Sequence, residues 1–239
     1  MQKPWIEGPA ELLIHAHEHL SLGSSFDNRI ALISIDNAVE LTIKTYLELP
    51  KRITKIKGLS RKQLDEAKNN FSALLDVFEN FGSNKIVGID LGDIEWYHRL
   101  RNQLYHEGNG ITVDTVKVES YAEIAKILYN NIFEEKFELP ENYIATNVGK
   151  FISTWAEVEK KLTEVKTKEG KRYYPTRKRI QHFVAEGKIS QHDADIFIAV
   201  NKFRNELVHG VKVPSKKEIS RMTKLLMDLL PKILSITTL

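Results

Sequence analysis

Apolar residues recur every three or four positions along most of this chain, which is the pattern of amphipathic helices. The stretch over residues 28–49, for example, carries an apolar stripe made of Ile35, Val39, Ile43 and Leu47. No segment alternates between apolar and polar residues over the length of a substantial sheet. Glycine (12) and proline (7) are scarce among the 239 residues, and this favours long helices over turn-rich strands. The sequence therefore predicts an all-α fold.

The helical patterns stop and restart at capping residues and helix breakers. We expect helices over residues 9–22, 28–49, 61–78, 94–108, 118–133, 148–165, 175–186, 191–210 and 214–234. Four of these helices have a residue suited to N-capping, namely Asp27, Ser60, Asp93 and Ser190. Between the fifth and sixth helices, Pro140 and its polar neighbours interrupt the pattern. We therefore predict two domains, over residues 1–140 and 141–239.

The composition excludes several classes of site and location. The chain has no cysteine, which excludes disulfides, thiolate metal sites and a cysteine nucleophile. Its beginning has no basic segment followed by an apolar one, and nothing in it approaches the ~18 apolar residues of a membrane span. We therefore expect a cytoplasmic protein with no membrane partner. The net charge of +3 and the pI of about 8.8 permit an acidic partner such as RNA without requiring one.

Two helix ends share a motif. Each contains Arg-Asn-x-Leu-x-His followed closely by glycine, and the two arginines, Arg101 and Arg204, lie 103 positions apart (204 − 101). A chance second copy of Arg-Asn-x-x-x-His in a chain of this composition has odds on the order of one in a hundred. In both halves a long helix containing a glutamate precedes the motif, and an amphipathic helix follows it. We infer two copies of one helical unit, the second without the opening helix or with a reduced form of it.

These motifs resemble the HEPN superfamily, whose pattern is an arginine, a polar residue that is often asparagine, three variable residues and a histidine at a helix end. The resemblance covers most of the chain and implies two tandem HEPN-like antiparallel helical bundles. Many HEPN proteins are endoribonucleases that use neither a metal nor another cofactor, and their active site forms where two domains bring two Arg/His pairs together. Others have lost catalysis. The resemblance implies RNA as the partner and leaves room for a homodimer and for an antitoxin or phage-defence partner.

The motif residues have the chemistry of metal-free RNA cleavage. That reaction needs a base for the 2′-hydroxyl, an acid for the leaving 5′-oxygen and a cation for the phosphorane. Histidine titrates near neutrality, and arginine contacts phosphate in a bidentate way. The asparagine lies four residues before the histidine, where it is placed to orient the imidazole. The expected catalytic residues are Arg101, Asn102 and His106 of the first motif and Arg204, Asn205 and His209 of the second.

Two alternatives to a nuclease site stay open. The helix dipole favours a histidine near a helix C-terminus, and an arginine there caps carbonyls, so each motif alone has a purely structural explanation. A non-catalytic RNA- or nucleotide-binding module would use the same residues. If the site is catalytic, each motif supplies half of the acid–base set, so two motifs must meet. Because one chain contains both, we expect them to meet within the chain rather than across a homodimer.

Aromatic and basic residues offer further contacts to RNA. Trp96, Tyr97 and Tyr105 lie beside the first motif and could stack on bases, although such residues are more often core. One basic run is suited to follow an RNA backbone, and its cations and aromatics are Lys171, Arg172, Tyr173, Tyr174, Arg177, Lys178 and Arg179. An ordinary solvated loop and helix start is the alternative for this run.

A histidine-rich segment, H-A-H-E-H, is a weaker candidate for a metal site. His15 and His19 share a helix face, on which they could bind a divalent cation. No third ligand is evident at helical spacing, and Glu18 points elsewhere. We therefore expect a solvated face and no metal site.

Overall fold

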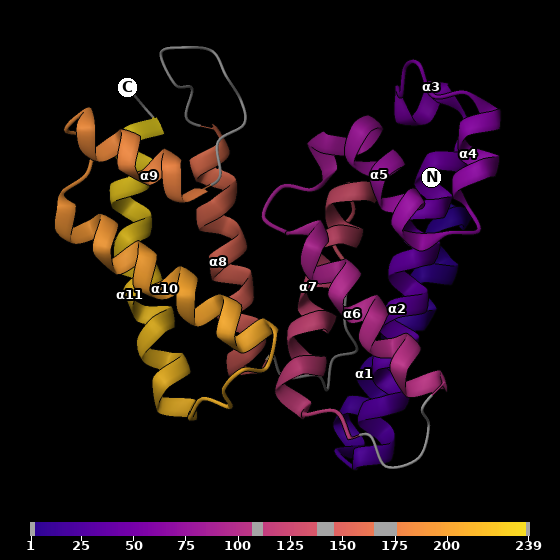
Figure 1. Cartoon of the computed structure of the whole chain (residues 1–239), viewed down its shortest axis with the longest axis horizontal. Coiled ribbons are helices and arrows are strands. Elements are labelled where there is room, and N and C mark those ends of the chain that lie inside the picture. Colours follow the sequence, from indigo (N-terminus) through magenta and orange to yellow (C-terminus); the bar gives the residue numbers. More distant parts are fainter. Residues whose placement is uncertain (1–2, 107–111, 138–145, 165–175, 238–239) are drawn as a thin grey trace. The chain divides into compact units, whose positions relative to one another are not determined.

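The structure is a computed structural model that describes residues 3–106, 112–137, 146–164 and 176–237. Every regular element in these ranges is a helix, which confirms the predicted all-α class (Figure 1). The chain divides into two compact units, residues 1–144 and 145–239. The predicted division at residue 140 lies outside the described residues. In the described part of the chain, no helix has both the length and the apolarity of a membrane span.

The first unit is organised around one long helix, α2 (Ser25–Glu48). Its other elements are η1 (Pro4–Ile6), α1 (Glu7–Leu22), α3 (Lys51–Thr54), α4 (Arg61–Ala67), α5 (Phe71–Gly82), η2 (Ser83–Lys85), α6 (Leu91–His106) and α7 (Thr115–Phe133). Helix α2 packs against α1, α5, α6 and α7, and it buries Leu32, Ile35 and Ile43 completely. The apolar stripe predicted from the sequence is thus the buried face of α2.

The second unit repeats part of this arrangement with α8 (Asn147–Glu164), α9 (Thr176–Ala185), α10 (Gln191–Val208) and α11 (Lys216–Thr237). Helix α8 packs against α9 and α11, and α10 packs against the same two helices. Aromatic pairs join α8 to α10: Phe151 meets Phe203 edge-on at 5.2 Å between centroids, and Trp155 stacks on Phe197 at 5.1 Å. In both units a long helix, α2 or α8, is followed by the helix that carries the motif, α6 or α10. A further helix, α7 or α11, comes after it.

Two of the four predicted N-caps are confirmed. Ser60 and Ser190 each accept a hydrogen bond from the backbone N–H three residues on, at 3.2 and 3.1 Å. The helix that follows Ser60 is shorter than predicted, because α4 ends at Ala67 and a new helix, α5, begins after Asn70. The Asn70 side chain accepts a hydrogen bond from the N–H of Ala73, and this favours a new helix start over a continuous helix.

Asp27 is not the cap of α2, because the helix begins earlier than predicted. Ser24 is the N-cap, and its hydroxyl oxygen accepts a hydrogen bond from the N–H of Asp27 at 3.1 Å. The Asp27 carboxylate accepts the Ser24 hydroxyl and lies 2.9 Å from Nδ1 of His19, so its negative charge stands in the first turn, where the helix dipole favours it. Similarly, α6 begins at Leu91, which puts Asp93 inside the first turn rather than before it.

The H-A-H-E-H segment of α1 is divided between solvent and core. His15 is exposed, with Nδ1 3.6 Å from Oε2 of Glu18, whereas His17 is buried and its ring stacks on Phe137 at 6.4 Å between centroids. His17 lies on the other side of α1 from His15 and His19, because two positions along a helix correspond to a turn of about 200°. Burial and, to a smaller extent, the charge of Lys126 together lower the pKa of His17 to about 4.

Acid should destabilise the fold through His17. The unfolded chain binds a proton here near pH 6.5 and the folded chain near pH 4, so the free energy of unfolding falls as the pH drops through this window. At pH 5 the expected loss relative to pH 8 is about 2 kcal/mol. We expect His17→Leu to remove this loss, and His192→Leu, at an exposed position of α10, to keep it. Urea unfolding at both pH values measures the difference, and equal acid sensitivity in wild type and His17→Leu would contradict the prediction.

Candidate functional site

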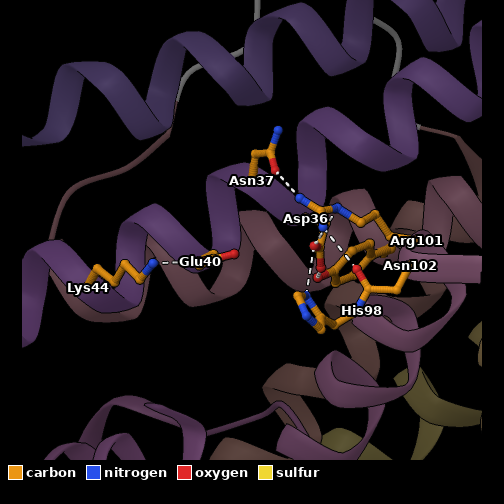
Figure 2. A network of polar contacts seen from close by, with 8 residues as sticks. Asp36, Asn37, Glu40, Lys44, His98, Arg101 and Asn102 are labelled. Atoms are coloured by element: carbon orange, nitrogen blue, oxygen red, sulfur yellow. Dashed lines mark hydrogen bonds and ion pairs between the residues drawn. The ribbon is translucent and has the colours of Figure 1, made fainter. Parts of the chain in front are cut away.

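A buried carboxylate, that of Asp36 on α2, lies at the centre of a polar network in the first unit (Figure 2). Its Oδ1 accepts a hydrogen bond from the Tyr121 hydroxyl of α7 at 2.9 Å. Its Oδ2 lies 2.9 Å from Nδ1 of His98 and 3.4 Å from Nε of Arg101, both on α6. Burying a charge is costly unless it is paired and hydrogen-bonded. These three partners therefore explain how the core keeps a carboxylate.

Helix α6 brings its polar side chains to α2 through its periodicity. His98, Arg101, Asn102 and Tyr105 are spaced at i, i+3, i+4 and i+7, so they lie along one face of the helix. Leu104, which does not belong to this set, is buried. Arg101 and Asn102 of the motif thus share a helix face with His98, which precedes the motif.

The guanidinium of Arg101 is held on several sides. Nη2 donates to Oδ1 of Asn37 and Nη1 donates to Oδ1 of Asn102, both at 2.9 Å, and the Tyr105 ring lies 5.1 Å from the guanidinium carbon. Nε faces Asp36. An arginine has five N–H groups, so one on each terminal nitrogen is left for an anion. The side chain is 22% exposed, which makes this preoriented cation accessible from solvent.

The orientation of the His98 ring is also fixed by its neighbours. Its ring stacks on Phe71 of α5, with the centroids 3.9 Å and the planes 20° apart. In the neutral form, donation from Nδ1–H to Asp36 fixes the tautomer and leaves Nε2 as an acceptor. Nε2 makes no hydrogen bond within the described part of the chain and is not sealed from solvent, and the side chain is 15% exposed. An acceptor nitrogen is therefore presented near the same carboxylate that holds Arg101.

Tyr121 is fixed as a hydrogen-bond donor. Burial raises its pKa well above the ordinary value, and the charge of Asp36 raises it further. The hydroxyl therefore keeps its proton throughout the physiological pH range. The ring of Tyr97 lies 4.2 Å from that of Tyr121 between centroids and nearly parallel to it, so α6 and α7 are also joined by stacking.

Of the three aromatic residues considered for base stacking, one lies on the surface beside the motif. Tyr97 is buried, and its hydroxyl donates to the carbonyl of Lys117 at 3.0 Å, so it is a core residue. Trp96 meets Tyr97 edge-on at 4.8 Å between centroids. Tyr105 is 63% exposed and lies over the guanidinium of Arg101. It is the member of this set with an exposed ring.

The second motif repeats the Arg–Asn contact in a more enclosed setting. Nη1 of Arg204 donates to Oδ1 of Asn205 at 3.3 Å, as Arg101 does to Asn102 in the first unit. Arg204 is 5% exposed, and Val208, the counterpart of Tyr105, is fully buried. His209 is the C-cap of α10 and is partly exposed, which leaves its side chain as the more accessible end of this motif.

The asparagines make a contact that differs from the one predicted. In both motifs the asparagine oxygen accepts a hydrogen bond from the guanidinium of the preceding arginine. His106 ends α6, and its side chain lies outside the described part of the structure. The predicted role of Asn102 and Asn205 in orienting histidine thus remains a prediction, while their contact with arginine is observed.

The basic run over residues 171–179 is only partly described. Lys171, Arg172 and the two tyrosines that follow lie outside the described residues, as does the side chain of Arg177. Lys178 is exposed, which fits a contact to an RNA backbone and an ordinary solvated helix start equally well. Arg179 is 7% exposed; burial lowers its pKa, and the charge of Glu159 on α8 opposes this shift. Arg179 is therefore packed inside the second unit and not presented along its surface as predicted.

Among the described residues, one group of side chains has ligand atoms close enough to share a metal ion. Asp36, Glu40 and His98 each offer an atom within 4.8 Å of the others. Both carboxylates already have cationic partners, however, since Asp36 lies beside Arg101 and Glu40 bonds to Lys44 at 2.5 Å (Figure 2). A metal ion would have to compete with these charges, so we assign no metal centre here.

Four contributors to the network were not among the predicted site residues, namely Asp36, Asn37, His98 and Tyr121. A partial signal was present in the sequence, because Asp36, Glu40 and Lys44 form a polar row at i, i+4 and i+8 beside the apolar stripe of α2. A polar row next to a buried stripe indicates a boundary with another helix. It does not say which helix packs there.

Loss of the Asp36 charge should destabilise the first unit. We expect Asp36→Asn to lower the free energy of unfolding by about 3 kcal/mol, because one amide oxygen cannot replace the two carboxylate oxygens that serve Tyr121, His98 and Arg101. The control is Glu40→Gln, one turn along α2, whose partly exposed pair with Lys44 should contribute less than about 1 kcal/mol. Denaturant unfolding measures both, and equal losses in the two variants would count against a central role for Asp36.

The described contacts thus define a fixed arginine in each unit and a fixed histidine beside the first. Comparison of the chain with family models, with curated proteins and with solved structures finds no match.

Proposed function

We propose that this protein is an endoribonuclease that cleaves RNA without a metal, using the Arg-Asn-x-Leu-x-His motifs of two HEPN-like domains. The observation that carries the proposal is the setting of Arg101. Its guanidinium is held by Asp36, Asn37 and Asn102 and remains accessible. A cation fixed in this way is suited to stabilise the charge of a phosphorane, since it needs no reorganisation when the charge develops.

The second motif supports the same chemistry through repetition. Arg204 and Asn205 make the contact that Arg101 and Asn102 make, and a histidine ends each helix. In the proposed reaction one histidine removes the proton of the 2′-hydroxyl, whose oxygen then attacks phosphorus. The P–O5′ bond breaks, and the 5′-oxygen takes a proton from a second, protonated histidine. The products are a 2′,3′-cyclic phosphate and a 5′-hydroxyl.

RNA is favoured over DNA as substrate because the nucleophile is the 2′-hydroxyl, which DNA lacks. Tyr105 adds a single-strand contact, since an exposed ring over Arg101 can stack on the base next to the bound phosphate. A role in phage defence or a toxin–antitoxin system follows from the family resemblance alone.

The second candidate is a module that binds RNA or nucleotides and does not cleave them. The observation that favours it is the enclosure of Arg204, which is 5% exposed within its own unit. A site with one accessible arginine could hold a phosphate without supplying the second Arg/His pair. Such a protein would bind RNA with a steep dependence on salt and leave it intact.

A cleavage assay on mixed RNA in EDTA separates the two candidates. We expect wild type to cleave and to leave 2′,3′-cyclic phosphate ends, and His106→Ala and His209→Ala each to lower the rate by roughly 10²-fold or more, the scale of a lost acid or base. His192→Ala, at an exposed histidine outside the motifs, is the matched control and should cleave like wild type. Binding without cleavage, or activity that vanishes in EDTA and returns with Mg²⁺, would refute the proposal.

A mixing experiment tests whether the two motifs of one chain form one site. The Arg101/His106 double alanine variant and the Arg204/His209 double alanine variant should each be inactive. If both motifs of one chain are needed together, mixing these variants restores nothing. Recovery of a sizeable fraction of wild-type activity after demonstrated subunit exchange would mean that motifs of two chains pair.

A further inference from the structure

We propose that His98 is a catalytic residue of the first unit and acts as the general base on the 2′-hydroxyl. This inference rests on the proposed function and extends it, because His98 lies outside the Arg-Asn-x-Leu-x-His motif. It assigns the base to His98 and the acid to one motif histidine, and it leaves the other motif histidine, when protonated, to stabilise the phosphorane as a cation.

The first argument is the orientation of the imidazole. Nδ1 lies 2.9 Å from the fully buried Asp36 carboxylate, and Phe71 stacks on the ring at 3.9 Å. A carboxylate on Nδ1 selects the tautomer with an accepting Nε2 and stabilises the imidazolium that forms when Nε2 takes a proton. These are the two properties that a general base requires.

The second argument is the position of this base relative to the cation. Oδ2 of Asp36 lies 2.9 Å from His98 and 3.4 Å from Arg101, so one oxygen atom fixes both groups. The two residues are one helical turn apart on the same face of α6. A phosphate on the remaining N–H groups of Arg101 would bring its neighbouring ribose close to the imidazole. The substrate class is therefore a phosphodiester with an adjacent hydroxyl.

The third argument is the difference between the two copies of the motif. Asn201 precedes Arg204 by three residues, as His98 precedes Arg101, and an amide is not a base at neutral pH. The repeat therefore keeps the motif and lacks this imidazole in its second copy. The base is assigned to the first unit, and the proton balance needs one further histidine as the acid on the 5′-oxygen.

His98→Asn is the sharpest variant, because the asparagine amide can still donate to Asp36 but cannot accept a proton. It also introduces the residue found at the matching place of the second unit. We expect cleavage of an RNA oligonucleotide to slow by roughly 10²-fold, the scale of a lost base. Asn201→Ala is the matched control and should cleave like wild type. Circular dichroism and urea unfolding should report a folded His98→Asn protein.

Rescue of the cleavage rate by imidazole distinguishes a catalytic histidine from a purely structural one. In His98→Ala the Phe71 ring still forms one wall of the vacated site, so added imidazole should restore a measurable part of the lost rate, at least several-fold. A substrate with sulfur in place of the leaving 5′-oxygen needs no acid, and His98→Asn should remain roughly 10²-fold slower than wild type on it.

The outcomes separate this inference from the proposed function. If wild type cleaves and His98→Asn cleaves within about threefold of it, the inference is wrong and the proposed function stands. Absence of rescue by imidazole, or wild-type rates for His98→Asn on the sulfur substrate, also overturns the assignment of His98 as base. If wild type does not cleave RNA at all, the proposed function fails and the inference fails with it.

Discussion

The pairing of the buried Asp36 carboxylate is the interaction on which the first unit depends. Three helices meet at this charge, since α2 provides the carboxylate, α7 provides the hydroxyl of Tyr121, and α6 provides His98 and Arg101. A charge removed from water costs several kcal/mol unless its partners compensate. Under the proposed function, two of these partners, His98 and Arg101, also act on the phosphodiester. Packing and chemistry are therefore coupled in this unit, because the interaction that stabilises the helices also orients the arginine and the histidine.

The two copies of the motif have kept one feature and diverged in others. Both retain the donation from arginine to the neighbouring asparagine, and both bury the leucine of the motif, Leu104 or Leu207. Around this shared element the first copy is open, with an exposed Tyr105, whereas the second is closed by Val208. This combination is what duplication of a helical unit, followed by divergence of its surroundings, would produce. Under the proposed function, this difference between the copies would give His106 and His209 different environments.

Helix class and several boundaries were predictable because they depend on local sequence. The stripe of α2 and the caps at Ser60 and Ser190 follow from periodicity and from hydroxyl side chains before helices. Burial was less predictable. The basic run did not reveal that Arg179 packs inside the second unit, and the H-A-H-E-H segment did not reveal that His17 faces the core. Both positions depend on which helix face meets a neighbour.

The residues of the candidate site also divide into those that could be predicted from the sequence and those that could not. Arg101 and Asn102 could be predicted because a repeated motif is visible in the sequence alone. Asp36 and His98 could not, since they lie 62 positions apart and become partners only when α6 packs on α2. A polar row along α2 indicated a boundary with another element but not the partner. Tertiary packing thus brings the Asp36 carboxylate to the motif, whereas the motif itself is visible in the local sequence.

Under the proposed function an arginine fixed in each motif binds the phosphodiester, and the Nε–H resonances of these arginines test this proposal most directly. Nε of Arg101 and Nε of Arg204 are both sealed from solvent, so slow exchange should make their ¹⁵N–¹H signals observable at neutral pH. Arg→Lys variants at the two positions assign them. On titration with a 2′-deoxy oligonucleotide, which can bind but not react, both signals should shift with one saturation curve. Binding of the oligonucleotide with neither signal moved would contradict the account.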